Sequence, residues 1–402
     1  MSSVPATPRS PAVAALRSPG VARLLGLSLV ARAPEAVLAL LFLLRTRDLG
    51  GSYALAGAVS GVAGLGMAAG GPLLGRVIDR VGQSGVLAVT GIVAGAAMVL
   101  AALLPGTTPA WALLPFALVA GATQPPIAAC LRALLGRIVP DPAVRHAALA
   151  VEASVQEITF MVGPLVFISL IAAHDPALGL GVAAVVLLAA TLLFAAAPEP
   201  RAVAATGTRR TAGAGPMRLG SIRALLAITV GLGVMFGAVE LAITAAAEEA
   251  GDPGAVGLLL AAYCLGSLVA GLITAHRGPG PGSPERTLLL LVLLCTAGHG
   301  LLAVAPNLVL LGLGLVLAGG AIAPLFTVVY SLCGQLAADG TATEAFTWLG
   351  SGLYAGAASG AALAGLLVGA ASPHAAFAAG ALAIGLAGLG VAAFRSVLRP
   401  AA

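Results

Sequence analysis

The stretch Gly75-Arg76-Val77-Ile78-Asp79-Arg80-Val81-Gly82 decides how this chain folds. An apolar, glycine-rich run at 53–74 precedes it, and a second apolar run at 86–104 follows it. An acid flanked by two arginines cannot lie in hydrocarbon, where a charged side chain is expensive. The stretch is also too short to be a domain. It therefore predicts a short charged turn at a membrane face, between two membrane-spanning segments.

The composition places the whole chain among helical membrane proteins. Of its 402 residues, 59% are hydrophobic and 9% are charged, whereas ordinary globular domains carry about 25% charged residues. Apolar stretches of about 18 or more residues are long enough to cross a bilayer as a helix, and such stretches recur along nearly the whole sequence. The predicted fold class is an all-α polytopic membrane protein, with the lipid bilayer as its surroundings.

The charged and sulfur-containing residues argue against several other classes of protein. All 20 basic residues are arginine, so the chain lacks the phosphate-loop lysine of ATP-driven machines, and no binding of nucleic acid is predicted. The cysteines lie singly in apolar segments, where they behave as small buried hydrophobes. They are Cys130, Cys264, Cys295 and Cys333. We predict no metal site and no cofactor.

Twelve apolar runs predict twelve transmembrane helices. They fall at about 24–44, 53–74, 86–104, 111–131, 151–171, 178–197, 224–246, 254–275, 287–305, 308–332, 346–370 and 375–394. The one long connection, 198–223, is rich in arginine and divides the chain into six plus six. We therefore predict a leader at 1–23, a six-helix bundle at 24–197, a linker at 198–223, and a second bundle with a short tail at 224–402. Pro126 in span four and Pro324 in span ten match in a weak internal repeat, as expected for two related bundles.

The arginines predict the orientation of the chain in the membrane. With the N-terminus inside, all but three of the 20 arginines fall in the inner segments; Arg45 and Arg47 lie outside, and Arg32 lies within a span. Because positive charge accumulates in cytoplasmic loops, both termini are predicted to be cytoplasmic. The leader, with four prolines and basic residues, is expected to be disordered and retained.

Span one carries the most conspicuous candidate site, Arg32-Ala33-Pro34-Glu35. At about 1.5 Å per residue, Arg32 and Glu35 lie roughly 12 and 17 Å from the inner end of the span. Spacing of three places the two side chains on one helix face, close enough to pair. A charge at this depth indicates a functional site, so substrate or proton binding is favoured over a pair that only stabilises packing.

Further polar residues within spans are candidates for substrate or proton binding. Glu157 lies roughly 9 Å inside the inner end of span five, whereas the place of Glu152 near that inner boundary suits solvation. A buried carboxylate favours its neutral form, which suits reversible protonation, and Glu240 in span seven is a similar lone acid. Gln124 and Gln156 join Arg32, Glu35, Glu157 and Glu240 as candidate residues for substrate and proton binding. Hydrogen bonding between helices is the alternative role for each of them.

The spacing Gly-x-x-x-Asp-Arg-x-Gly, at this place in a twelve-span chain, resembles the loop between the second and third helices of the Major Facilitator Superfamily (MFS). In that family the loop contacts the start of the eleventh helix and helps to latch the outward-facing state. The resemblance assigns Asp79 as the latch acid, Arg76 and Arg80 as its charged neighbours, and Gly75 and Gly82 as backbone-permissive ends. An acid is favoured at a helix N-terminus, so the physical reading agrees.

Two features depart from the proton antiporters of that family. Many of them carry an arginine in span four, and residues 116–124 contain none. Their glycine-rich signature in span five is reduced here to Gly163-Pro164. Arg32 is then the candidate for the missing intramembrane cation.

The sequence thus predicts a bacterial MFS transporter of the inner (plasma) membrane, monomeric, and not an enzyme. The favoured function is proton-coupled export of a small hydrophobic or amphipathic compound, driven by the proton gradient. The alternative is uptake or facilitated transport of a polar metabolite. A polytopic enzyme is a third possibility, disfavoured because the five histidines are dispersed, and a sensor built on a transporter fold is a fourth.

Overall fold

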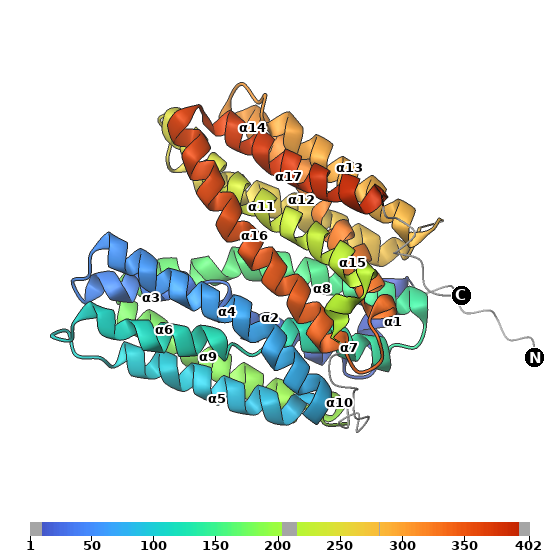
Figure 1. Cartoon of the computed structure of the whole chain (residues 1–402), viewed down its shortest axis with the longest axis horizontal. Coiled ribbons are helices and arrows are strands. Elements are labelled where there is room, and N and C mark those ends of the chain that lie inside the picture. Colours follow the sequence, from blue (N-terminus) through green and yellow to red (C-terminus); the bar gives the residue numbers. More distant parts are fainter. Residues whose placement is uncertain (1–9, 203–214, 281, 394–402) are drawn as a thin grey trace, which may run out of the picture.

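The computed structural model describes residues 10–202, 215–280 and 282–393. Residues 1–9 of the predicted leader, the part of the linker that contains Arg209 and Arg210, and the tail from 394 lie outside the described residues. The rest consists of helices joined by short turns (Figure 1).

The helices of the first half include two irregular segments, the 3₁₀ turn η1 and the π-helix η2. Their bounds are α1 Pro11–Arg17, α2 Val21–Glu35, α3 Leu38–Asp48, α4 Tyr53–Val81, α5 Gln83–Ala102, η1 Ala110–Ala112, α6 Leu113–Ala122, α7 Ile127–Ile138, α8 Pro142–Gly163, η2 Pro164–Ala172, α9 Pro176–Ala196 and α10 Pro198–Ala202.

The second half begins with a 3₁₀ turn and continues with seven longer helices. Their bounds are η3 Pro216–Arg218, α11 Gly220–Glu249, α12 Ala255–Arg277, α13 Pro284–Leu302, α14 Leu308–Gly319, α15 Ile322–Leu336, α16 Ala342–Ala370 and α17 Pro373–Ala393.

Twelve segments of the described chain are long and apolar enough to cross a membrane, and each overlaps one predicted span. The prediction of twelve spans is therefore confirmed. Several spans run further than their apolar runs, because their polar ends stay helical. Span four continues to Ile138, span five begins at Pro142, and span eleven begins at Ala342.

Three spans are broken along their length. Span one breaks between α2 and α3, at Ala36-Val37, just after the turn that contains Pro34, and span four breaks between α6 and α7, at Gln124-Pro125-Pro126. Proline lacks an N–H and its ring clashes with the preceding turn, which explains both positions. Span ten breaks between α14 and α15, shortly before Pro324, the residue that matches Pro126 of span four in the internal repeat. Broken helices of this kind are tolerated at depth where they line a cavity.

The two halves of the chain lie against each other along a seam (Figure 1). The first half, blue to green, packs α5 against α9 and α4 against α6, and the second half, yellow to red, packs α11 against α16 and α17. The main contacts across the seam are α4 with α16 and α8 with α12. We call the end of the molecule that carries α1, at the right of Figure 1, the α1 end.

The charged stretch 75–82 lies at the α1 end but is not the turn that the sequence predicted. Helix α4 continues through it to Val81, and only Gly82, with φ of 96°, leaves the helix. Gly82 is thus a backbone-permissive end, as the resemblance implied. Gly75 is helical, and a Cβ there would lie 2.9 Å from the Cα of Glu344 on α16. Gly75 therefore serves the close approach of two helices.

Helix α1 corrects a second prediction, that of a wholly disordered leader. Ser10 caps the helix by accepting a hydrogen bond from the backbone N–H of Val13, and Ala15 is completely buried. The helix contacts α8 of the first half and α12 of the second half. The expectation of disorder followed from the prolines, but Pro11 occupies the first turn, where proline is well tolerated.

Candidate functional site

A cavity of about 90 Å³ lies on the seam, and we call it the central cavity. The breaks in spans one and four place Arg32, Glu35 and Gln124 on its wall, and α8 contributes Gln156. From the second half come aromatic side chains of α15 and α16. The cavity therefore has charged and polar side chains from one half and four aromatic rings from the other.

A buried charge cluster forms the polar side. Arg32 Nη1 donates to Glu152 Oε1 at 3.0 Å, and Arg132 donates from Nε and Nη2 to the two oxygens of Glu152 at 2.9 Å each. Both guanidinium groups also donate to Gln156 Oε1 at 2.9 Å. Glu152 is 0% exposed. Burying an ion is expensive unless it is paired and hydrogen-bonded, and this cluster joins two cations to one anion.

Glu152 was expected to be solvated near the inner boundary, and the structure differs. The carboxylate points into the protein between α2 and α7, and both arginines reach it. The expectation failed because span five begins nine residues earlier than its apolar run, at Pro142. Glu152 consequently lies well inside the helix.

The predicted pair of Arg32 with Glu35 is absent from the ion pairs of the described residues. Arg32 turns instead to Glu152, which is 120 positions away in sequence. Glu35 is the last residue of α2, and its Oε1 accepts a hydrogen bond from the hydroxyl of Tyr354 on α16, at 2.9 Å. That bond joins the two halves across the cavity.

Arg132 is a site residue that the sequence analysis did not predict, because it follows the apolar run 111–131 and is therefore assigned to an inner loop. It lies on α7, is 6% exposed and lines the central cavity. Its guanidinium carbon lies 3.6 Å from the ring centroid of Tyr330, a cation–π contact across the seam. The signal was available, since the apolar residues Ala133, Leu134 and Leu135 follow Arg132 directly. That pattern indicates that the span continues past 131.

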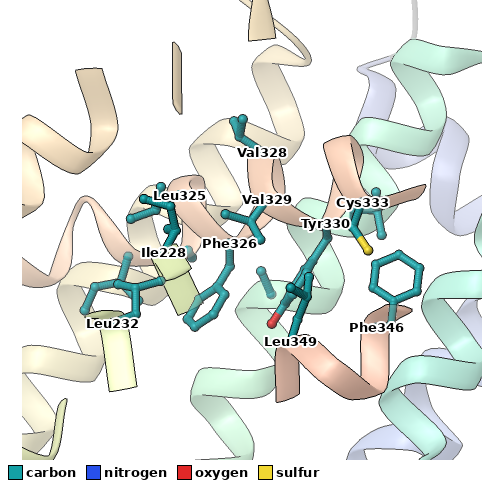
Figure 2. Close-up of a cluster of buried hydrophobic side chains, with 14 of the residues drawn as sticks. Ile228, Leu232, Leu325, Phe326, Val328, Val329, Tyr330, Cys333, Phe346 and Leu349 are labelled. Carbon is teal, nitrogen blue, oxygen red and sulfur yellow. The ribbon is translucent and has the colours of Figure 1, made fainter. Parts of the chain in front are cut away.

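The aromatic side of the cavity comes from α15 and α16. Figure 2 shows Tyr330 between Phe326 and Phe346. The ring centroids of Phe326 and Tyr330 are 5.4 Å apart, and those of Tyr330 and Phe346 are 6.2 Å apart. The Tyr330 hydroxyl also donates to Gln156 Oε1, at 3.4 Å. Tyr330 thus links the aromatic cluster to the charge cluster.

The remaining predicted residues are distributed differently. Gln124 lines the cavity, and its buried Oε1 has no hydrogen-bond donor among the described residues. Glu157 is 8% exposed and contacts the Ser267 hydroxyl of α12, so it belongs to the seam beside the cavity. Glu240 is exposed and does not line the cavity. The structure therefore brings together Arg32, Glu35, Gln124 and Gln156, and leaves Glu157 and Glu240 apart from them.

A second, larger cavity of about 730 Å³ opens towards the α1 end, and we call it the vestibule. Its wall includes Arg145 and His146 of α8 and Arg277 of α12. Arg132, Tyr330 and Phe346 line both the vestibule and the central cavity. These three side chains therefore separate the two spaces.

The charged motif of α4 closes onto α16 beside the vestibule. The Asp79 carboxylate accepts hydrogen bonds from the backbone N–H groups of Thr343 and Glu344, at 3.2 and 2.8 Å. Both groups lie in the first turn of α16, where N–H groups are unpaired within the helix and the dipole is positive. Arg76 donates to Glu344 Oε1 at 2.8 Å, whereas Arg80 is exposed. Two charge-assisted contacts thus hold α4 against α16.

The chain was compared with known families and structures. The sequence profile of the Major Facilitator Superfamily matches residues 24–244, more than half of the chain. The chain belongs to the Major Facilitator Superfamily. Members of this superfamily are membrane transporters, so the chain is a transporter and not an enzyme. No curated protein sequence matches it.

Solved MFS structures share the fold over nearly the whole chain. The human organic anion transporter MFSD10 (TETRAN) aligns with TM-score 0.69 and 19% identity, covering 94% of this chain and 97% of its own. A bacterial homologue of the iron transporter ferroportin, in its outward-facing state, gives TM-score 0.71 and 13% identity, with coverage of 94% and 99%. A variant of the E. coli fucose:proton symporter FucP gives 0.70 and 15%, with coverage of 93% and 98%. These likenesses establish the MFS fold.

The structure changes the interpretation of one departure from the MFS antiporters, the absence of an arginine from the first part of span four. Residues 116–124 do lack an arginine, but span four continues to Ile138 and carries Arg132 in its second part. Arg32 therefore does not stand in for a missing cation of span four. The two arginines share one carboxylate.

Proposed function

We propose that this protein carries a small amphipathic compound across the membrane by alternating access of the central cavity. The observation that carries the proposal is the make-up of the cavity wall. Arg32, Glu35 and Gln124 of one half face Phe326 and Tyr330 of the other. A site between two related bundles that rock against each other suits alternating access, and a wall with both polar and aromatic sides suits an amphipathic cargo.

The proposal includes an orientation and a location. We place the α1 end in the bacterial cytoplasm and the protein in the plasma membrane, as a monomer. The excess of arginine in the segments at this end supports this placement under the positive-inside rule. The vestibule would then open towards the cytoplasm.

Proton coupling is proposed to act through carboxylates on the seam. Glu35 contacts Tyr354, and Glu157 contacts Ser267, so each touches the opposite half. A proton on either carboxyl alters a contact between the halves, and therefore biases one conformation over the other. Glu35 is the first candidate, because it alone of the two lines the cavity.

Two directions of transport are candidates. Export in exchange for protons is the direction that the sequence favoured. Uptake together with protons is the second candidate, and the charge cluster favours it. Arg32, Arg132 and Gln156 form a strongly polar wall, which suits a polar metabolite better than a purely hydrophobic drug.

The contact of α4 with α16 is proposed to latch one of the two conformations. The hydrogen bonds from the first turn of α16 to Asp79 and the pair of Arg76 with Glu344 support this role. They join the two halves only at the α1 end. Rocking that separates the halves there must break both contacts.

The experiment that tests coupling is proton flux in proteoliposomes loaded with a pH-sensitive dye. Small amphipathic acids, amines and neutral compounds are added to the wild type, Glu35→Gln, Glu157→Gln and Glu240→Gln. We expect at least one compound to move protons in the wild type, Glu35→Gln to abolish that movement, and Glu240→Gln to preserve it. Transport of a compound with no proton movement in any variant would exclude proton coupling.

A further inference from the structure

We infer that the cargo is a small organic anion, whose negative group is bound by Arg32 and Arg132 next to the positively charged vestibule. This inference rests on the proposed transport function and names the substrate class of that same site. It combines the charge of the central cavity, the charge of the vestibule, and the residue that the two share.

The charge cluster has spare capacity for an anion. A guanidinium group has five N–H donors. In its bonds to Glu152 and Gln156, Arg32 uses Nη1 and Nη2, and Arg132 uses Nε and Nη2. Arg32 Nε and Arg132 Nη1 donate to no protein acceptor within the described part of the chain. A carboxylate or similar group in the cavity would accept from such donors and would balance the second cation.

Glu35 is the group that competes with such an anion. The charged and titratable groups that face it are Arg32 on its own helix, Arg132 on α7 and Tyr354 on α16. An ionised Glu35 balances the excess positive charge of the cluster. When Glu35 is protonated, the excess positive charge of the cluster is available to bind an anionic cargo. Binding of the anion and of the proton therefore favour each other, and such coupling is reciprocal. This favours the second candidate direction, in which both move together.

The vestibule has the same sign of charge. Arg132, Arg145 and Arg277 line it, and no carboxylate is among its described lining residues. A cleft lined by one sign of charge raises the local concentration of ligands with the opposite sign. The volume of about 730 Å³ leaves room for a small organic molecule. Anions are therefore concentrated next to the central cavity.

Arg132 connects the two spaces. It lines both cavities, and its guanidinium lies over Tyr330. An anion that passes between the central cavity and the vestibule contacts Arg132, and in the central cavity it lies beside Arg32 and the rings of Phe326 and Phe346 (Figure 2). The aromatic rings suit an apolar body attached to the negative group.

The test measures equilibrium binding to the full-length protein in phosphatidylcholine nanodiscs by titration calorimetry. The probes are phenylacetate, phenylacetamide and phenethylamine, which share a ring and a short chain but carry negative, no and positive charge. We expect phenylacetate to bind about tenfold or more tightly than the other two, and more tightly as the pH is lowered towards 5.5. Equal or tighter binding of the amine, or no binding of phenylacetate at 10 mM, overturns the inference.

Variants locate the binding without disturbing the buried cluster. Arg145→Gln and Arg277→Gln each remove one vestibule charge. Each should weaken the binding of phenylacetate about two- to fivefold, as expected for a partly screened charge. Arg223→Gln removes an exposed charge at the start of α11, outside both cavities, and should change nothing. Glu35→Gln should bind phenylacetate tightly at neutral pH and lose the pH dependence. Equal weakening by Arg223→Gln would show a non-specific surface effect and would exclude the vestibule.

The source of the anion is tested separately. Nanodiscs that contain phosphatidylglycerol supply an anionic headgroup. If lipid occupies the vestibule, phenylacetate binding is lost in these discs at constant ionic strength, and the cargo inference fails. Because binding is measured without a gradient, an absence of proton flux leaves this result intact. Conversely, coupled flux of a neutral compound would support the proposed transport function but would overturn the inference that the cargo is an anion.

Discussion

Glu152 is the residue that holds the central site together, because it separates two buried arginines that otherwise repel. We predict that Glu152→Gln destabilises the protein by about 3–5 kcal/mol, the usual effect of removing one partner from a buried ion pair. The expected observation is a large drop in melting temperature, followed by the fluorescence of Trp111 and Trp348.

The matched control for this prediction is Glu199→Gln, which breaks the ion pair with Arg23. The Arg23 side chain is 49% exposed, and exposed pairs contribute about 0–1 kcal/mol. A drop as small as that of the control would mean that the cluster contributes little to the stability of the fold.

At this scale the sequence predicts which residues matter better than it predicts their partners. Arg32, Glu35, Gln124 and Gln156 were candidates because polar groups within spans are costly, and all four line the cavity. The partner of Arg32 is far away in sequence, so a rule for neighbours on one helix pointed to Glu35 instead. Arg132 was missed by a single residue, because the apolar run was ended at 131.

Helices α4 and α16 approach each other closely at Gly75, and this contact can be tested by adding one carbon. We predict that Gly75→Ala pushes the helices apart, because the new Cβ would lie 2.9 Å from the Glu344 Cα and would also meet the Thr347 hydroxyl. Overpacking costs about 1–3 kcal/mol. A cysteine replacing Ser351, which is buried against Ala68 of α4, should therefore react roughly tenfold faster with a thiol reagent.

The control for Gly75→Ala is Gly64→Ala on the same helix, where a Cβ would meet nothing within 4 Å. Cys264 is replaced in all variants, since the other native cysteines are buried. Unchanged reactivity at 351 in Gly75→Ala would show that the two helices already separate freely.

Helix positions follow from the sequence, whereas helix ends and breaks follow only in part. Apolar runs predicted all twelve spans, because length and hydropathy alone decide whether a helix can cross a membrane. Apolar runs do not show where a polar helix end stops, so the sequence predicts a turn at 75–82, most of which is helical in the structure. Pro34 lies in the last turn before the break in span one, whereas the break in span ten, at residues 320–321, precedes Pro324.

For the whole molecule, the contacts of Asp79 predict how the conformations are populated. Asp79→Asn weakens two charge-assisted bonds to the start of α16, by about 1 kcal/mol, which is roughly a fivefold shift in population. Spin labels on cysteines replacing Arg137 and Asp339 report separation at the α1 end, and labels replacing Thr107 and Asp252 report the opposite end. We expect the first distance to lengthen and the second to shorten.

The opposite movement at the two ends is what distinguishes rocking from local fraying. Asp141→Asn is the control, because Asp141 caps α8 within its own half and at the same end. Lengthening at the α1 end without shortening at the opposite end would show that Asp79 only anchors the start of α16.

The accessibility of helix α1 to a protease should report this rocking motion. It touches both α8 and α12, so any separation of these helices at the α1 end must detach it from one of them. A helix of seven residues is too short to persist by itself in water, and a detached α1 would unwind where Arg17 is already exposed. Trypsin cleavage at Arg17 would then proceed at a rate set by the fraction of open molecules. The rate of cleavage by trypsin added on that side of the membrane therefore measures the fraction of open molecules without any label.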